Sequence, residues 1–177
     1  MKYLILGNKN AIAYKEIFPL IKENKLWLGI NNVKTFDVPD ETPLGKNVVK
    51  TPDGKKVAKF GNICWFTNLD IKKRHDKLGL YKKYAPEEYP KYDNYDAIEV
   101  SKVKYIPEDC DGVMGVPITF LDNYCPEQFE IIGCMEPATD LKKLKLRSGF
   151  KEYKSRQIKV NGVICQKSYH RLLIKRK

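Results

Sequence analysis

The most constraining feature of the chain is the continuous apolar run Tyr3-Leu4-Ile5-Leu6. Such a run, with no polar residue on either face, is typical of a strand that is buried on both faces of a parallel sheet. A loop-forming cluster at residues 7–10 follows it. Apolar residues then recur near helical spacing over residues 11–24, with Pro19 in a first turn or at a kink. Strand, loop and helix in this order make half of a βαβ unit, so the sequence predicts an α/β fold whose sheet begins upstream of this strand.

The remaining patterns predict a single domain over residues 1–177 with short strands and one long insertion. Residues 37–59 are rich in Pro, Gly, Lys and Asp, and the turn sequence Thr51-Pro52-Asp53-Gly54 favours a protruding loop or hairpin there. The dipeptide Asn161-Gly162 is the strongest hairpin signal in the chain. Strands are expected at residues 27–30, 63–67, 129–133, 157–160, 163–166 and 170–174, a short charged helix at 71–80, and an irregular tyrosine-rich segment at 81–95.

Positive charge is concentrated in two segments. The whole sequence has 33 Lys and Arg against 22 Asp and Glu, a net charge of +11. Residues 45–77 hold nine basic residues against three acidic ones, and the basic terminal segment 141–177 holds 13 against one. Residues 85–140 hold three basic residues against 13 acidic ones. Clustered cations suit a polyanion, because phosphate contacts release counterions only where positive charges gather. A lysine-rich solvated surface is the alternative.

Other features disfavour whole classes of function. The sequence has no run of 18 apolar residues, so no membrane span is expected. The five cysteines are odd in number and never two or three residues apart, which favours reduced thiols in the cytoplasm over a disulfide framework or a zinc site. The sequence contains no G-x-S-x-G, H-E-x-x-H, P-loop or G-x-G-x-x-G motif. His75 and His170 have no partner at metal-ligand spacing, so no metal is expected.

Two segments carry side chains that suit a ligand site. Asn8 and Asn10 lie just past the carboxyl end of the first expected strand, where open α/β sheets bind ligands. An Asx turn and a helix cap are the simpler roles for these two residues. Trp65 and Thr67 lie where aromatic and amide side chains mix, and such a mixture can stack on a base and read it. Composition alone favours core packing for Trp65.

Seven stretches together resemble EcoRI-type adenine-specific DNA methyltransferases downstream of their catalytic motif. They are long, ordered and spread over almost the whole chain, so as a set they form a specific signal. The stretches are YLILGNKNAI (residues 3–12), YKEIFPLIK (14–22), LWLG (26–29), FGNICWFTNLD (60–70), YPKYDNYDAI (89–98), GVMGVPITFLD (112–122) and PEQFEIIG (126–133).

The resemblance implies a Rossmann-like enzyme of restriction–modification that moves a methyl group from S-adenosylmethionine to N6 of adenine in double-stranded DNA. Such enzymes hold the donor with a glycine-rich loop, and hold the extruded adenine with an Asn/Asp-Pro-Pro-aromatic motif. Neither motif occurs in this chain. We therefore expect the C-terminal portion of a methyltransferase, inactive alone and binding no S-adenosylmethionine by itself. Its α/β fold would be an incomplete Rossmann-like sheet of later strands, with an antiparallel terminal hairpin and inserted loops.

The resemblance leaves the partner open. Besides double-stranded DNA, the missing N-terminal half in trans and a second copy of the chain are candidates. The alternative function is a stand-alone nucleic-acid-binding module without catalysis. No catalytic or cofactor-binding residue is carried over from the family. The candidate substrate and DNA contacts are Asn8, Asn10, Lys46, Lys55, Lys56, Trp65, Thr67, Lys72, Lys73, Arg74, Arg147 and Arg156.

Overall fold

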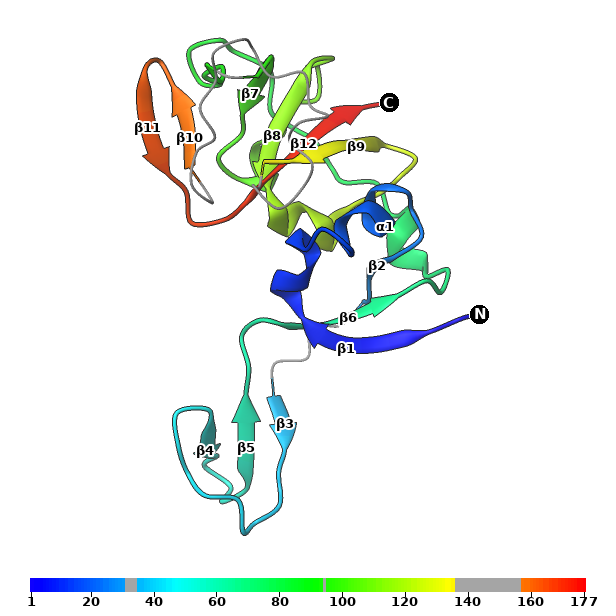
Figure 1. Cartoon of the computed structure of the whole chain (residues 1–177), viewed down its shortest axis with the longest axis vertical. Coiled ribbons are helices and arrows are strands. Elements are labelled where there is room, and N and C mark those ends of the chain that lie inside the picture. Colours follow the sequence, from blue (N-terminus) through cyan, green and yellow to red (C-terminus); the bar gives the residue numbers. More distant parts are fainter. Residues whose placement is uncertain (31–34, 94, 136–156) are drawn as a thin grey trace.

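A computed structural model gives the fold of the chain and describes residues 1–30, 35–93, 95–135 and 157–177. This part is mixed α/β, with strands in several small sheets and few, short helical segments. Three of the four sheets in the described residues lie in a body, and the fourth, an arm formed by β3, β4 and β5, projects from it (Figure 1). The predicted α/β class is confirmed at this level. None of the helices in the described ranges is long and apolar enough to cross a membrane.

The largest sheet has four strands in the order β7-β8-β12-β9. The last strand of the chain lies between two earlier ones and is antiparallel to both, whereas β7 and β8 are parallel. Because β12 is flanked on both sides, Leu172, Leu173 and Ile174 are completely buried. The strands are β7 (Ala97–Glu99), β8 (Val113–Pro117), β9 (Phe129–Cys134) and β12 (Arg171–Arg176).

The second sheet of the body has the order β1-β6-β2 and is antiparallel throughout. On one face, Cys64, Phe66 and Leu28 are buried in the core. β1 itself is exposed along most of its length, so the prediction of a strand buried on both faces of a parallel sheet is wrong for this chain. The physical reason is that β1 is an edge strand here, paired with β6 alone. The strands are β1 (Leu4–Asn8), β2 (Trp27–Leu28) and β6 (Ile63–Thr67).

The arm includes residues 37–59, for which a protruding loop or hairpin was predicted, and it has three strands. Its sheet has the order β3-β5-β4, and buried Val57 and Ala58 on the central strand form its small core. The turn predicted at residues 51–54 joins the outer strand β4 to the central strand β5, and Gly54 has a φ of 87°, which favours glycine. The strands are β3 (Thr35–Asp37), β4 (Val48–Lys50) and β5 (Lys56–Lys59).

The helices predicted from periodicity are mostly wrong in length. The predicted helix over residues 11–24 is a 3₁₀ turn followed by one short α-helix, which has Pro19 in its first turn as predicted. The predicted charged helix over residues 71–80 is a single 3₁₀ turn. The segments are η1 (Lys9–Ala13), α1 (Phe18–Lys22), η2 (Lys72–His75), η3 (Val103–Tyr105) and η4 (Ile118–Asn123).

The predicted terminal hairpin is confirmed. β10 (Gln157–Val160) and β11 (Val163–Gln166) pair antiparallel around Asn161 and Gly162. Both turn residues have positive φ, 49° and 77°, as a two-residue hairpin turn of this kind requires.

A buried polar cluster joins the outer strand of the large sheet to its centre. Arg171 on β12 donates to the Glu99 carboxylate on β7 at 2.8 and 3.1 Å, and the Tyr92 hydroxyl donates to the same carboxylate. The ring of Tyr92 lies over β8 at Gly115, where an added Cβ would overlap it. Burial raises the pKa of Glu99, but the hydrogen bonds and charges of Arg171, Tyr92 and Lys167 together outweigh it, and the net shift is downward. The cluster is therefore an ionised pair built into the core.

Candidate functional site

The Asn8 and Asn10 segment serves a capping role. Asn8 is the last residue of β1 and the N-cap of η1, because its side-chain oxygen accepts from the N–H of Asn10 at 2.9 Å. The side-chain amide of Asn62 donates to the same oxygen at 3.1 Å. This is the simpler of the two roles expected from the sequence. Asn8 and Asn10 are both exposed, so their remaining polar groups face outward at this end of the sheet.

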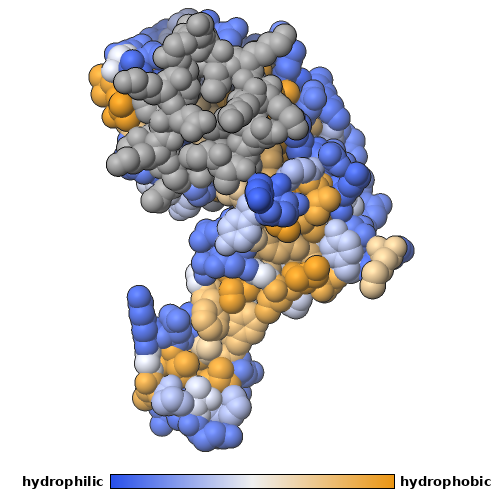
Figure 2. Space-filling model, in the orientation of Figure 1, coloured by the Kyte–Doolittle hydropathy of each residue, from blue (hydrophilic) through white to orange (hydrophobic). Residues whose placement is uncertain are grey.

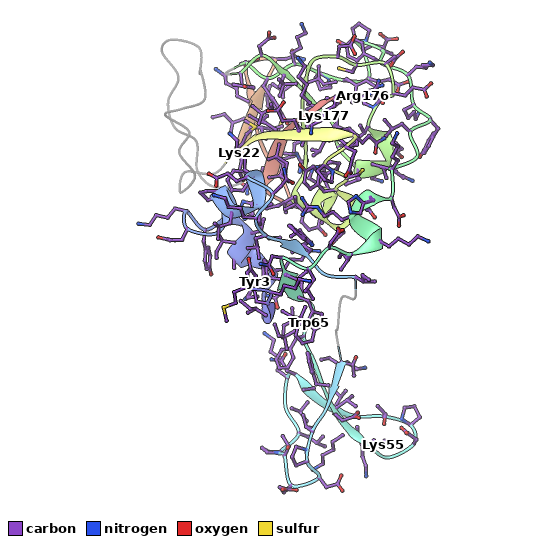
Figure 3. The ribbon with its side chains drawn as sticks, turned by 90° about the vertical axis from the view of Figure 1, so that its right-hand side faces the viewer. Tyr3, Lys22, Lys55, Trp65, Arg176 and Lys177 are labelled. Carbon is purple, nitrogen blue, oxygen red and sulfur yellow. The ribbon has the colours of Figure 1, made fainter. Side chains whose placement is uncertain are left out.

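Thr67 and Trp65 lie on the same strand but in different environments. Thr67 is buried, its hydroxyl donates to the carbonyl of Tyr3 at 2.7 Å, and it accepts from the N–H of Leu69 at 3.0 Å. Both capacities of this hydroxyl are used inside the fold, so Thr67 holds the strand ends together and does not face a ligand. Trp65 is half-buried and lies opposite Leu6. Figure 3 places it at the end of the body from which the arm extends.

Lys72, Lys73 and Arg74 of η2 form a basic turn, and contacts of Arg74 with the body hold this turn in place. The guanidinium of Arg74 stacks on Trp27 at 3.5 Å from the ring centroid and donates to the side chain of Asn24 at 2.8 Å. Burial lowers the pKa of Arg74, and its Nη1 is buried without a hydrogen-bond partner in the described residues. Such a stacked arginine is a rigid cation. Neither Lys72 nor Lys73 forms an ion pair with any residue that the structure describes, so both ammonium groups remain available at this turn.

The neighbouring histidine ties the basic turn to the body. His75 lies between two carboxylates, with Nε2 2.7 Å from Asp70 and Nδ1 2.9 Å from Glu127. Hydrogen bonds to these two partners raise the pKa of His75. The pKa of Glu127 is lowered to about 2, through hydrogen bonds from Cys125, its own backbone and His75. The ion pairs strengthen when His75 is protonated.

The lysines of the arm differ in their availability. Lys46 and Lys55 are exposed, and Figure 3 shows Lys55 on the arm, away from the body. Lys56 is not free in the same way, since its ammonium donates to the carbonyl of Asp40 and, at 2.8 Å, to that of Thr42. Lys56 therefore fixes the long loop of the arm. Among the lysines predicted to contact DNA in the arm, Lys46 and Lys55 are the better candidates for phosphate contacts.

Several predicted contacts are not brought together. Arg147 and Arg156 lie outside the described residues, as does the 141–156 part of the basic terminal segment. Within the described ranges, no cluster of three metal-ligating side chains exists. Asn24 and Trp27, which contact the guanidinium of Arg74, were not among the predicted site residues. Nothing in the local sequence indicates them, because each lies about 50 positions from the arginine that it holds.

Known proteins give a consistent family for this chain. The family model of the adenine-specific methyltransferase EcoRI matches residues 1–177, and the chain belongs to this family, as its sequence segments indicated. It is 46% identical over 182 residues to the type II methyltransferase M.EcoRI of Escherichia coli, covering 99% of this chain and 50% of that protein. The type II methyltransferases M.MpnI of Mycoplasma pneumoniae and M.MgeORF184P of Mycoplasma genitalium are 39% and 38% identical, with 99% of this chain and 57% of each relative covered. The chain therefore spans about half the length of these curated relatives. No solved structure matches it significantly.

Proposed function

We propose that this chain is the C-terminal portion of an adenine-specific DNA methyltransferase of a restriction–modification system. The observation that carries the proposal is the family match over the whole chain, together with 46% identity to M.EcoRI. The reaction would transfer a methyl group from S-adenosylmethionine to N6 of adenine. The glycine-rich donor loop and the Asn-Pro-Pro-aromatic motif are missing from these 177 residues. The chain alone would therefore neither bind the donor nor catalyse the reaction.

The three strands β1, β6 and β2 are proposed to be later strands of a Rossmann-like sheet. In their support, β1 reads in sequence as an interior strand, and it lies at the edge of the three-stranded sheet with its second side open to a further strand. The end of β1, with Asn8 and Asn10, would then lie at the carboxyl edge of the completed sheet, where ligands of such folds bind.

The role of this portion would be to hold DNA. Lys72, Lys73 and Arg74 on the anchored basic turn, with Lys46 and Lys55 on the arm, are the proposed phosphate contacts. Lysine ammonium groups serve as point charges for phosphates, while the stacked arginine fixes the turn. The cation-rich segment 45–77 contains all five of these residues. Trp65 would remain a surface residue of the sheet rather than a reader of bases.

Two measurements test the proposal on the chain itself. Isothermal titration with S-adenosylmethionine should show no binding, whereas tight binding would mean that the chain holds a donor site of its own. A gel shift on duplex DNA should show binding that weakens steeply with salt. Changing Lys72 and Lys73 to Ala should reduce the slope of log K against log salt by about 1.8, since each phosphate contact contributes about 0.9.

A matched pair of lysines controls for the loss of charge alone. Lys102 and Lys104 are exposed and lie close together at the 3₁₀ turn η3. Both belong to the acidic segment 85–140. Changing both to Ala should leave the salt slope almost unchanged. Equal losses for the two double variants would show that binding follows net charge and not the basic turn. Duplex binding that never supports methyl transfer, even with the rest of a methyltransferase present, would favour the stand-alone binding module instead.

A further inference from the structure

His75, the last residue of η2, contacts two carboxylates at once. Its Nε2 lies 2.7 Å from Asp70, which precedes the turn, and its Nδ1 lies 2.9 Å from Glu127, which precedes β9. A neutral imidazole has one N–H donor and one acceptor nitrogen, whereas an ionised carboxylate only accepts. Both contacts can therefore be hydrogen bonds only when the ring carries two protons. The arrangement is that of an imidazolium.

Loss of the second proton would leave one of these carboxylates facing a ring lone pair. Glu127 does not take up that proton near neutral pH, because its pKa is lowered to about 2 by hydrogen bonds from Cys125, its own backbone and His75. A neutral ring therefore keeps a hydrogen bond to only one of its two partners. The contact with Glu127 joins the turn to a distant part of the chain, whereas Asp70 lies only five positions away in sequence. Deprotonation thus weakens the attachment of the turn and leaves both carboxylate charges uncompensated.

The charge of the basic turn depends on this proton. Arg74, the neighbour of His75, interacts electrostatically with both carboxylates. Together with Glu127, residues 70–77 carry a net charge of +1 when His75 is neutral and +2 when it is protonated. The titratable and charged groups around the ring are Asp70 ahead of the turn, Glu127 and Cys125 ahead of β9, and, within residues 72–77, Lys72, Lys73, Arg74, Asp76 and Lys77.

The ring is open to solvent and has few competitors as a proton acceptor near neutral pH. Its side chain is 49% exposed, so it exchanges protons freely. Hydrophilic residues line the right-hand flank of the body in Figure 2, the side on which the turn lies in Figure 1. The sequence has two histidines, and the second, His170, immediately precedes β12. Lysine, arginine and ordinary carboxylates keep their charge between pH 6 and pH 8, so histidine dominates titration in that range.

We propose that DNA binding by the basic turn is coupled to protonation of His75. The imidazolium adds a positive charge beside the phosphates, neutralises two carboxylates that would repel them, and ties the turn to Glu127. His75 acts here as a positioning residue, through the three cations that precede it. Hydrogen bonds to the two carboxylates raise its pKa, so the proton is held below that pKa and affinity for DNA falls as pH rises through it. By reciprocity, bound DNA raises the pKa further. This inference rests on the proposed function and adds a regulation of the same site by pH.

The test measures the affinity of the full 177-residue chain for a rhodamine-labelled DNA duplex, by fluorescence anisotropy at low salt over the range from pH 6 to pH 8. Affinity should fall about three- to tenfold across this range, as expected for the loss of one charge roughly 5–10 Å from the phosphates. His75→Gln should bind at every pH about as weakly as the unaltered chain at pH 8. His170→Gln, which removes the other histidine, is the matched control and should keep the full pH dependence.

A second variant separates titration of the ring from a purely structural role. Glu127→Gln removes one of the two carboxylates that favour the imidazolium, so the midpoint of the pH dependence should move to lower pH. Thermal melts at each pH check that the variants stay folded, as their exposed positions favour.

Three results would overturn the inference alone, with duplex binding intact. They are a pH dependence that His75→Gln leaves unchanged, a loss of affinity in that variant that is the same at pH 6 and pH 8, and an unmoved midpoint in Glu127→Gln. A chain that binds no duplex at any pH would contradict the DNA-holding role of the proposed function, and this inference with it.

Discussion

Replacing Arg171 by Met should lower the free energy of unfolding by about 3 kcal/mol. Arg171 and Glu99 are 5% and 4% exposed, and removing one partner of a buried ion pair typically costs about 3–5 kcal/mol, because the other charge stays buried without compensation. The lower end applies here. Lys167 remains 3.3 Å from the Glu99 carboxylate, and the Tyr92 hydroxyl still donates to it. Methionine also keeps much of the apolar stem of the arginine.

Urea denaturation followed by tryptophan fluorescence measures this loss, and the melting temperature should fall by about 6–12 °C for a chain of this size. The variant Glu99→Gln, alone and combined with Arg171→Met, completes a double-mutant cycle. The double variant should be destabilised by clearly less than the sum of the two single variants, because it buries no unpaired charge. A loss below about 1 kcal/mol for Arg171→Met, or full additivity in the cycle, would refute the assignment of Glu99 and Arg171 as a buried ionised pair.

Three further predictions follow from single contacts. Gly115→Ala should destabilise the chain by about 1–3 kcal/mol, since its Cβ would overlap the buried ring of Tyr92; urea unfolding measures this, and an unchanged midpoint would contradict the packing. Thr67→Val should cost about 1–3 kcal/mol in the same assay, because the partly buried N–H of Leu69 and C=O of Tyr3 both lose their partner; a neutral effect would show that these groups find other partners. The pKa of His75 is raised by hydrogen bonds to two carboxylates, so its stabilisation should be complete below its unfolded pKa and should be lost as pH rises through the folded pKa. Melts of the chain and of His75→Gln should therefore differ at pH 5 and converge above pH 8, and a constant difference would remove the ion pairs from the account.

The parts of the fold that could be predicted are those whose structure is set by neighbouring residues. The Asn161-Gly162 hairpin was predicted correctly because positive φ at both turn residues favours this dipeptide strongly. β6 was predicted at its observed bounds, because the apolar run 63–67 is short and lies between polar residues. The arm was recognised from its turn residues, although its third strand was not.

The errors arose where tertiary pairing decides the structure. β1 looks like an interior strand in sequence, but its neighbours within this chain leave it at an edge. The helix expected over residues 11–24 breaks into two short turns, because five residues of α1 suffice to bring Phe18 and Ile21 into the core. The contacts of Arg74 with Trp27 and Asn24, and the ion pair between Glu99 and Arg171, could not be predicted. In each case the residues are far apart in sequence and meet only in the folded chain.

The sequence indicated which cations belong to the candidate site, but it did not indicate how their side chains are arranged or which of them are used inside the fold. Charge counting indicated the segment that holds Lys46, Lys55, Lys72 and Lys73, yet only the structure separates these from Lys56, whose ammonium holds the loop of the arm. Thr67 was named as a candidate because its residue type suits a ligand, and its hydroxyl proves to be used entirely within the fold.

The most direct test of the central proposal is methyl transfer to duplex DNA, measured as N6-methyladenine by mass spectrometry after digestion to nucleosides. The reaction contains S-adenosylmethionine, a duplex that M.EcoRI methylates, and either the 177-residue chain, the unmatched half of M.EcoRI, or both. N6-methyladenine should form only when both polypeptides are present. Methylation by the chain alone, or none by a mixture in which the two polypeptides form a complex, would contradict the proposed function.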